Sequence, residues 1–273
     1  MKIFIAGLGL IGGSYAQGLT ANGHIVYGYD PHEPTLNYAL SHHYIKDAGI
    51  KYLKESDVII LGFYPQKNVE FVRMHLGLFV TGQVITDVSG IKKTMVGQIE
   101  DLLPKGVNYC SHHPMAGKEK RGIEHANWHI FKGTNFITIE TPNTTLYAIT
   151  VIQELGKQLG FNKISTLSKE EHDELIGYTS QLPHAMAVAL VNSNTHDKTA
   201  SFTGDSYRDL TRIAVINELL WSELFLDNKV ELLSAIRVFE QELDKIKNAL
   251  ETNDKDALKQ LFIQSTKRRS QLK

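Results

Sequence analysis

Short apolar runs alternate with helical stretches over the first half of the chain. The strand-like runs are residues 2–6, 24–29, 57–63, 83–87, 108–112 and 136–140. Between them lie stretches with helical character, such as 11–21 and 66–76. This alternation predicts a parallel sheet covered by helices on both faces.

The pattern changes near residue 168. Ser168 and Glu171 have the spacing of a capping box, which predicts the start of a long helix. Farther on, apolar residues recur at intervals of three and four, which predicts one apolar helical face about six turns long. These residues are Val230, Leu233, Ile236, Phe239, Leu243, Ile246 and Leu250. Such a face needs a partner within the chain or in a second subunit, and we expect a homodimer formed through the helical half.

The first expected strand runs directly into a glycine-rich turn. Gly7, Gly9 and Gly12 form the pattern G-x-G-x-x-G between a strand and a helix. In such a turn the first glycine permits the tight bend, the second lets a pyrophosphate approach the backbone, and the third lets helix and strand pack closely. The N-terminus of the helix then offers free N–H groups to the phosphates. The expected cofactor contacts are Gly7, Leu8, Gly9, Leu10, Ile11 and Gly12, together with Tyr64 after the run 57–63.

An acidic residue at the end of the second expected strand bears on the choice of cofactor. Asp30 stands 23 positions after Gly7 and can accept hydrogen bonds from both ribose hydroxyls of the adenosine. Its charge would repel a 2′-phosphate, and residues 31–33 contain no arginine to hold one. We therefore expect NAD rather than NADP. The fold expected is an N-terminal Rossmann-type doubly wound sheet over residues 1–165, followed by an all-helical substrate and dimerisation domain over 166–273. Any linker is expected near 160–167.

Composition excludes several other classes of protein. The 273 residues carry a net charge of -1, so no bulk field attracts nucleic acid or an anionic membrane. The sequence contains no run of about 20 apolar residues, as a membrane span would need. A single cysteine, Cys110, forms neither an internal disulfide nor a thiolate metal cage, which favours a reducing, cytoplasmic location. The histidines lack a matching acidic motif, so we expect no metal site.

Four segments, in order along the chain, resemble the prephenate and arogenate dehydrogenases. Residues 7–14 are similar to the opening of these enzymes, and 113–117 resemble their His-Pro-x-Ala-Gly signature, with Glu119 two positions on. Residues 180–184 resemble a Ser-His-Leu-Pro-His segment, and 209–214 an Asp-x-Thr-Arg-Ile-Ala segment. The resemblance implies an oxidoreductase of tyrosine biosynthesis that converts prephenate to 4-hydroxyphenylpyruvate with NAD, and a dimer formed through the C-terminal helices.

The chain departs from this family at two positions. Where the family often has Thr-Asp-x-Gly-Ser-Val-Lys, residues 86–92 exchange the serine and the glycine, so Ser89 stands one position early. We still expect Ser89 to contribute to catalysis. Gln181 replaces the first histidine of the helical segment. Its neutral amide can bind substrate through hydrogen bonds, but it carries no proton at pH 7.

The reaction needs a base beside the substrate hydroxyl, and His113 is the expected base. An imidazole titrates near neutral pH, and ligands of such sheets bind at the carboxyl ends of strands. The preceding residue, His112, should point to the other face of its strand. The match of His113 to the family signature decides between the two.

The substrate is a dianion and needs cations or hydrogen-bond donors. Arg212 can hold one carboxylate with its planar guanidinium, and Asp209, three positions earlier, can orient it. Glu119 is expected in the same charge network. Pro183 should kink a helix so that Ser180 and His184 face the substrate, where His184 binds the side-chain carboxylate or carbonyl.

Three other functions remain open at this point. Arogenate carries an amino acid side chain whose ammonium would favour an acidic pocket, whereas His184 suits an anion or a keto group. A β-hydroxyacid dehydrogenase or imine reductase also joins a Rossmann domain to helices, but leaves the segments around His113 and Arg212 without a role. A non-catalytic NAD-sensing module would not need both of these residues.

Overall fold

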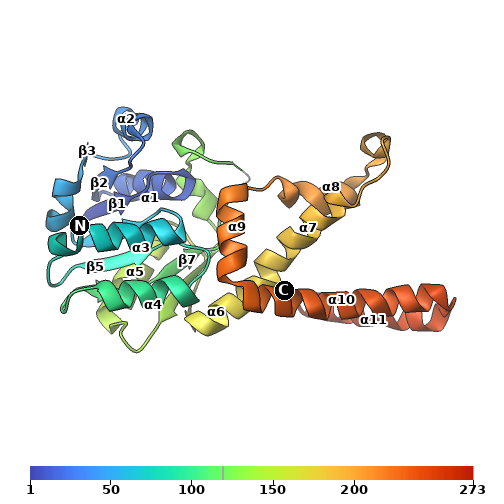
Figure 1. Ribbon diagram of the computed structural model, residues 1–273. Helices are drawn as coiled ribbons and strands as arrows, with labels where there is room; N and C mark the ends of the chain where they lie inside the picture. The colour runs from blue at the N-terminus through green and yellow to red at the C-terminus, as the bar shows by residue number, and fades with distance from the viewer. Residues whose placement is uncertain (119, 273) are drawn as a thin grey trace.

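A computed structural model describes residues 1–118 and 120–272, which form an α/β part and a helical part (Figure 1). The α/β part contains a six-stranded sheet in the order β3-β2-β1-β4-β5-β6, with every pairing parallel. Its strands are β1 (Lys2–Ala6), β2 (Ile25–Tyr29), β3 (Asp47–Ala48), β4 (Val58–Leu61), β5 (Val84–Asp87) and β6 (Asn108–Tyr109). The expected parallel sheet is thus confirmed.

Helices cover both faces of this sheet, because successive strand residues alternate between two apolar clusters. Ile3 and Ile5 of β1 face one cluster, and Phe4 faces the other. The helices are α1 (Leu10–Ala21), α2 (Glu33–Ser41), α3 (Pro65–Met74), α4 (Lys93–Leu102) and α5 (Leu146–Gln158). Short 3₁₀ turns occur at Ile50–Glu55, Leu76–Leu78, Ile123–His125 and Trp128–Phe131. The doubly wound arrangement agrees with the sequence analysis.

A second, three-stranded sheet departs from that expectation. It consists of β7 (His112–Pro114), β8 (Asn135–Glu140) and β9 (Lys163–Ser168), with β7 antiparallel and β9 parallel to β8. The expected strand 108–112 is therefore divided, since Cys110 still donates its N–H to Ile85 of the first sheet, whereas the carbonyl of Ser111 accepts from Ile139 of the second. The expected linker at 160–167 is wrong, because most of it belongs to β9. The proposed domain boundary at 165/166 falls inside the same strand.

The helical part begins as the sequence predicts. Ser168 and Glu171 form the capping box at the start of α6 (Lys169–Ile176). A π-helical turn at Gly177–Gln181 joins α6 to α7 (Leu182–Asn192). Pro183 lies in the first turn of α7, where a missing N–H costs least. The helix therefore continues from Lys169 to Asn192, with a π-helical turn directly before Pro183.

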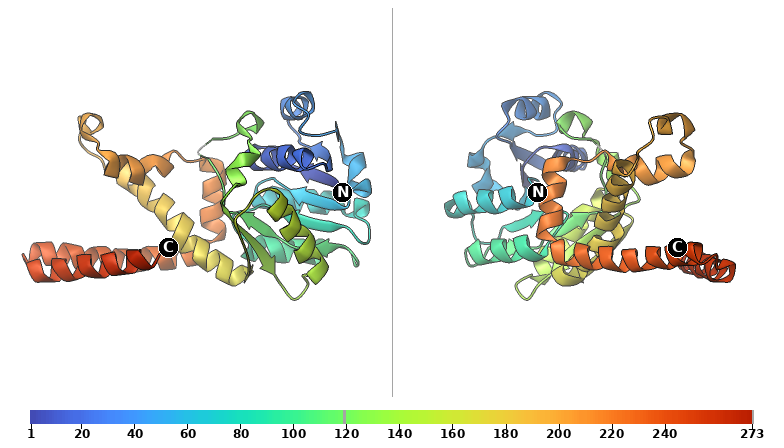
Figure 2. Two further views of the ribbon diagram at one scale, coloured as in Figure 1. Left: turned by 180° about the vertical axis from the view of Figure 1, so that it is seen from behind. Right: turned by 45° about the vertical axis from the view of Figure 1, so that its right-hand side comes forward.

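Four more helices follow α7 in the described part of the chain. They are α8 (Asp205–Thr211), α9 (Glu218–Asp227), α10 (Lys229–Glu251) and α11 (Lys255–Gln271), with 3₁₀ turns at Thr199–Phe202 and Arg212–Ala214. Figures 1 and 2 show α10 and α11 extending side by side as a hairpin, α7 and α8 forming a second projection, and α9 standing against the α/β part. Among the described residues, no helix is both long and apolar enough to cross a membrane.

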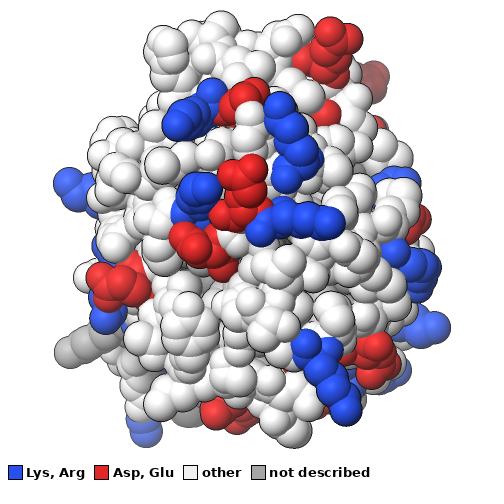
Figure 3. Space-filling view, turned by 90° about the vertical axis from the view of Figure 1, so that its left-hand side faces the viewer, with Lys and Arg blue, Asp and Glu red and all other residues white. Residues whose placement is uncertain are grey.

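The face of the α/β part that is turned away from these projections carries charges of both signs. Lysine and arginine side chains lie there among aspartates and glutamates (Figure 3). By contrast, α10 exposes apolar side chains, including Val230 at 63% and Leu243 at 51%. An exposed apolar surface therefore lies on the helical part, in contrast to the charged face of the α/β part.

Candidate active site

The glycine turn between β1 and α1 has the geometry that a nucleotide needs. Gly7 has a φ of +91°, and a Cβ on Gly12 would lie 1.9 Å from the carbonyl oxygen of Gly7. A Cβ on Gly9 would instead meet nothing within 4 Å, so this side of the turn is open. No side chain caps the N-terminus of α1, which begins at Leu10, and its first N–H groups can bind a phosphate.

Asp30 supports this turn from the end of β2. Its Oδ2 accepts the N–H of Leu8 at 2.8 Å, and its Oδ1 accepts the N–H of His32 at 2.9 Å. A carboxylate oxygen has more than one lone pair, so both atoms can still accept a ribose hydroxyl. The residues at the turn thus fit a dinucleotide, as the sequence analysis expected.

Tyr64 lies where the α/β part meets α9. It precedes α3, and its hydroxyl accepts a hydrogen bond of 2.8 Å from Nδ2 of Asn217, the N-cap residue of α9. In the same region the N–H of Gln66 donates to Oε1 of Glu223 at 2.7 Å. Helix α9 therefore adjoins the carboxyl edge of the sheet, where ligands of such folds bind.

His113 is held on β7 by a second histidine. Its Nδ1 lies 2.9 Å from Nε2 of His172 on α6. Its own Nε2 lies 3.8 Å from the position that a Cβ on Gly90 would occupy. Burial, and then the nearby His172, Lys92 and His112, hold the pKa of His113 well below its usual range. At pH 7 the ring is therefore neutral with one bare nitrogen, which can accept a proton but is less basic than that of a free imidazole.

His172 and Asp173 were not predicted from the sequence. His172 is fully buried, and its Nδ1 lies 2.7 Å from Oδ1 of Asp173. The Asp173 carboxylate also accepts the backbone N–H groups of Lys92 at 2.9 Å and of Lys93 at 2.7 Å. These contacts join the start of α4 to α6 and place His172 behind His113.

A buried ion pair anchors the strand that carries His113. Nζ of Lys92 lies 2.8 Å from Oδ1 of Asp87 and donates to the carbonyl of His112 at 2.6 Å. Burial raises the pKa of Asp87, but the charge of Lys92 and the hydrogen bonds to the carboxylate together outweigh it and lower the pKa overall. Tyr109 donates to the second carboxylate oxygen at 2.7 Å. This pair, also missed in the sequence, ties the end of β5 to β7.

His112 faces the opposite side of β7, as alternation along a strand predicts. Its Nε2 lies 2.7 Å from the hydroxyl of Tyr15, and its Nδ1 lies 2.6 Å from Oγ1 of Thr86. Burial, with a further contribution from Lys92, lowers the pKa of His112 to about 3. It is a neutral structural residue, which leaves His113 as the histidine of this pair at the candidate site.

The exchange of serine and glycine at positions 89 and 90 decides which residue lies beside His113. Oγ of Ser89 donates to Sδ of Met95 at 3.3 Å and accepts from Nδ2 of Asn68 at 3.1 Å, so it points toward α3 and α4. Gly90 instead lies beside Nε2 of His113 and near Leu224 of α9. This geometry gives no support to the catalytic contact expected of Ser89, because the backbone turns its side chain away.

His184 and Gln181, which lie in α7 and the π turn, make different kinds of contact. His184 stacks on Trp221 of α9 with ring centroids 3.7 Å apart, and its Nδ1 bonds the carbonyl of Ser180 at 2.8 Å. Gln181 is buried, and its Nε2 donates to the carbonyl of Leu224 at 2.8 Å while its Oε1 accepts from Asn228 at 2.8 Å. In this conformation Gln181 joins helices, and the substrate contact expected of it has no geometric support.

The expected anion-binding residues lie beyond the end of α7. Asp209 on α8 and Arg212, at the start of the following 3₁₀ turn, both have exposed side chains. Glu119 falls outside the described residues. The roles expected of these three residues, and of Ser180 and His184, stay predictions. Among residues 1–118 and 120–272, no cluster of three or more His, Cys, Asp or Glu side chains could hold a metal ion.

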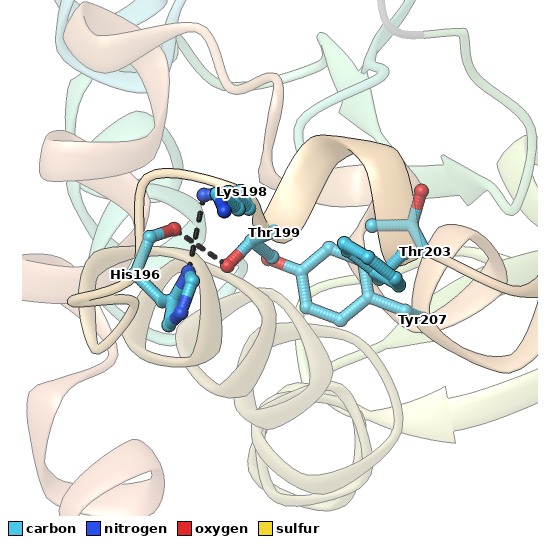
Figure 4. A pocket seen from close by; sticks show the side chains of 6 residues that line it. His196, Lys198, Thr199, Thr203 and Tyr207 are labelled. Atoms are coloured by element: carbon cyan, nitrogen blue, oxygen red, sulfur yellow. Dashed lines mark hydrogen bonds between the residues drawn. The ribbon is translucent and has the colours of Figure 1, made fainter.

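A separate hollow lies at the far end of the α7–α8 projection. It is lined by His196, Lys198, Thr199, Phe202, Thr203 and Tyr207. Figure 4 shows these side chains gathered around the connection between the two helices. The hollow is remote from β7 and the glycine turn (Figure 1), so it is not part of the candidate site.

Comparisons with known proteins agree with this arrangement. Residues 15–164 match the family model "Prephenate dehydrogenase, nucleotide-binding domain", and residues 168–264 match "Prephenate dehydrogenase, dimerization domain". The chain is 29% identical over 272 residues to a prephenate dehydrogenase of Bacillus subtilis, covering 95% of this chain and 73% of that protein. It is also 29% identical over 287 residues to a cyclohexadienyl dehydrogenase of Zymomonas mobilis, covering 99% and 96% of the two chains.

A solved structure extends the likeness to three dimensions. Prephenate dehydrogenase from Aquifex aeolicus, in complex with hydroxyphenyl propionate and NAD+, aligns with a TM-score of 0.89 and 26% identity over 99% of this chain and 98% of that one. The expected Rossmann-type domain followed by a helical domain is therefore confirmed, as is the expectation of a nucleotide cofactor. The glycine turn, the histidine on β7 and the two matched domains show that this chain belongs to the prephenate dehydrogenase family.

Proposed function

We propose that the chain catalyses the NAD-dependent oxidative decarboxylation of prephenate to 4-hydroxyphenylpyruvate. The observation that carries this proposal is the neutral His113, whose Nε2 faces Gly90 at the carboxyl edge of the sheet, beside α9. The names of the relatives from Bacillus subtilis and Aquifex aeolicus support the same substrate. A nucleotide held at the glycine turn would reach toward this edge.

The chemistry follows from the structure of prephenate, a cyclohexadienyl ring with a hydroxyl, a ring carboxylate and a pyruvyl side chain. NAD, when bound, supplies the acceptor for the hydride of the hydroxyl-bearing carbon. Nε2 of His113 takes the hydroxyl proton as the C–O bond becomes a carbonyl. The bond to the ring carboxylate then breaks and carbon dioxide leaves. The electron pair of that bond completes the aromatic ring and passes through it to the carbonyl oxygen, which takes the proton back from His113 to give the phenol hydroxyl. Aromatisation makes the sequence effectively irreversible.

The cofactor preference rests on Asp30. Its two oxygens already hold the turn through Leu8 and His32, so the carboxylate is fixed where the adenosine ribose would lie. A 2′-phosphate at this place would meet a negative charge, whereas two hydroxyls would find acceptors. We therefore propose NAD as the cofactor.

Arogenate is the alternative substrate. It differs from prephenate only in its side chain, which bears an ammonium and a carboxylate in place of the keto acid. His184, stacked on Trp221, offers an imidazole rather than a carboxylate to that side chain. This favours the keto acid, whereas Arg212 would bind a carboxylate that both substrates carry.

The deciding experiment measures the appearance of reduced cofactor by absorbance, with prephenate or arogenate supplied together with NAD or NADP in all four pairings. We expect the highest kcat/KM with prephenate and NAD. A His113→Asn variant should lose about 10²- to 10⁴-fold in kcat, the usual contribution of a general base, with unchanged affinity for NAD. Preference for arogenate would overturn the substrate assignment. Failure of all four pairings, with NAD still bound, would overturn the reaction.

A further inference from the structure

The hydrogen bonds behind His113 form a directed chain from a carboxylate to the catalytic ring. Asp173 accepts backbone N–H groups on both oxygens, from Lys92 on Oδ1 and Lys93 on Oδ2. These groups belong to the first residues of α4, a place that favours an anion. A carboxylate has no hydrogen to donate. The hydrogen between Asp173 and His172 therefore lies on Nδ1 of His172.

This assignment fixes the next ring. Burial lowers the pKa of His172, which is fully enclosed, so the ring is neutral and carries a single hydrogen. With that hydrogen on Nδ1, Nε2 of His172 is an acceptor. It lies 2.9 Å from Nδ1 of His113, which must donate. Nε2 of His113 is then the bare nitrogen, and it is the atom that faces Gly90.

We propose that Asp173 and His172 are positioning residues that hold His113 in one tautomer. In this tautomer Nε2, the atom that faces Gly90, is bare and can act as the base. The proposal rests on the function assigned to His113 above. When Nε2 takes the hydroxyl proton, His113 becomes an imidazolium with both nitrogens protonated. Nδ1–H keeps its bond to His172, and the carboxylate of Asp173 stabilises the added positive charge through that ring. The logic is that of a Ser-His-Asp triad with one imidazole inserted between the acid and the base.

Two substitutions at position 172 separate this role from simple packing. The amide of His172→Gln can reach the place of Nε2, so it can still accept from His113 but loses the bond to Asp173. The amide of His172→Asn can reach the place of Nδ1, so it keeps the bond to Asp173 but leaves His113 without an acceptor. A positioning role requires the glutamine variant to be the more active, whereas a structural role that serves Asp173 and α4 requires the asparagine variant to be.

The experiment compares kcat of both variants with wild type at saturating prephenate and NAD, with NAD affinity and circular dichroism as checks on folding. We expect the glutamine variant to lose about tenfold or less and the asparagine variant about 10²- to 10³-fold, since misplaced general bases cost this much. Equal losses, or a more active asparagine variant, would overturn the proposal.

A second readout does not depend on turnover. Imidazole ¹⁵N shifts of the full chain labelled with ¹⁵N-histidine report which nitrogen carries the hydrogen, and a His113→Asn sample identifies the His113 signals by their loss. We expect hydrogen on Nδ1 and a bare Nε2 at pH 7.5. Hydrogen on Nε2 would overturn the relay even if the enzyme oxidises prephenate. Conversely, hydrogen on Nδ1 in a protein inactive on prephenate would leave the relay standing and reject the proposed function.

Discussion

Three neutral histidines, 112, 113 and 172, lie close enough to Lys92 of the Asp87–Lys92 ion pair for its charge to affect each ring. Burial is the first cause of the lowered pKa in each of them, and the ammonium of Lys92 adds to it. An imidazole that stays neutral when buried would be protonated in the unfolded chain at mildly acidic pH. Folding stability should therefore depend on pH in a predictable direction.

We predict that acidification below about pH 6.5, the usual pKa of histidine, destabilises the protein. The unfolded chain then binds protons that the folded chain rejects, so each such histidine costs up to about 1.4 kcal/mol per pH unit. For His112 this cost continues down to its folded pKa of about 3. Above pH 6.5 the contribution is fully present. Urea unfolding between pH 7.5 and 4.5 measures the slope.

His112→Gln provides the control for this prediction. Its amide can still bond Tyr15 or Thr86, but it binds no proton, so the slope should fall by about one proton relative to wild type. Asp87 titrates below this range in the folded chain, because its pKa is lowered from 3.8. The same slope in both proteins would mean that His112 is not held neutral.

The sequence predicted single residues only where a local signal exists. His113 was singled out because it stands at the end of the predicted strand 108–112 and matches a signature, and alternation along the strand correctly turned His112 away from it. His172 had a weaker signal, four residues before Ile176 on one face of α6, but nothing local indicates that this face meets β7. The role expected of Ser89 stays a prediction without geometric support, because one step along the backbone decides which residue lies beside His113.

Among the elements, the turn between β1 and α1 depends on glycines for two different reasons. Gly12 has no room for a side chain, since a Cβ would lie 1.9 Å from the carbonyl oxygen of Gly7. Gly9 has room within the protein, and its missing side chain matters only to a ligand. Folding and nucleotide binding can thus be separated within one turn.

We predict that Gly12→Ala impairs folding and that Gly9→Ala impairs nucleotide binding. The methyl group at position 12 forces α1 away from β1 and should cost at least about 1–3 kcal/mol of folding stability. The methyl group at position 9 should leave the melting temperature unchanged. It should weaken NAD binding by about tenfold or more, equivalent to about 1.4 kcal/mol. Thermal unfolding and calorimetric titration with NAD measure the two effects. A stable Gly12→Ala protein, or unaltered NAD affinity in Gly9→Ala, would contradict this division.

The elements that the sequence missed lack a periodic signal of their own. Strand β9 (Lys163–Ser168) mixes polar and apolar residues and is defined by its pairing with β8. Strand β7, which also pairs with β8, begins at His112, so only two residues separate it from Tyr109, the last residue of β6. No property of the run 108–112 shows where the chain passes from one sheet to the other. The glycine turn and the capping box, in contrast, are local, and both formed as predicted.

At the scale of the whole molecule, most of the apolar face predicted for α10 is uncovered within one chain, and only Ile236 and Phe239 are half-buried. Val230, Leu233, Leu243 and Leu250 are 63%, 49%, 51% and 60% exposed. The hairpin of α10 and α11 projects from the α/β part (Figure 2), and residues 168–264 match the dimerization domain of the family. We propose that a second copy of the chain covers this face.

Leu243→Glu should weaken the dimer. In a symmetric dimer each substitution occurs twice, and losing the burial of one leucine costs about 1.5–3 kcal/mol, so the pair costs about 3–6 kcal/mol. The dissociation constant should rise by roughly 10²- to 10⁴-fold. Sedimentation over a range of concentrations measures it. Gln241→Glu adds the same charge two residues away, on the opposite side of the helix, and should leave the dimer intact. If both variants dissociate alike, added charge rather than the apolar face is responsible, and if neither does, the dimer forms elsewhere.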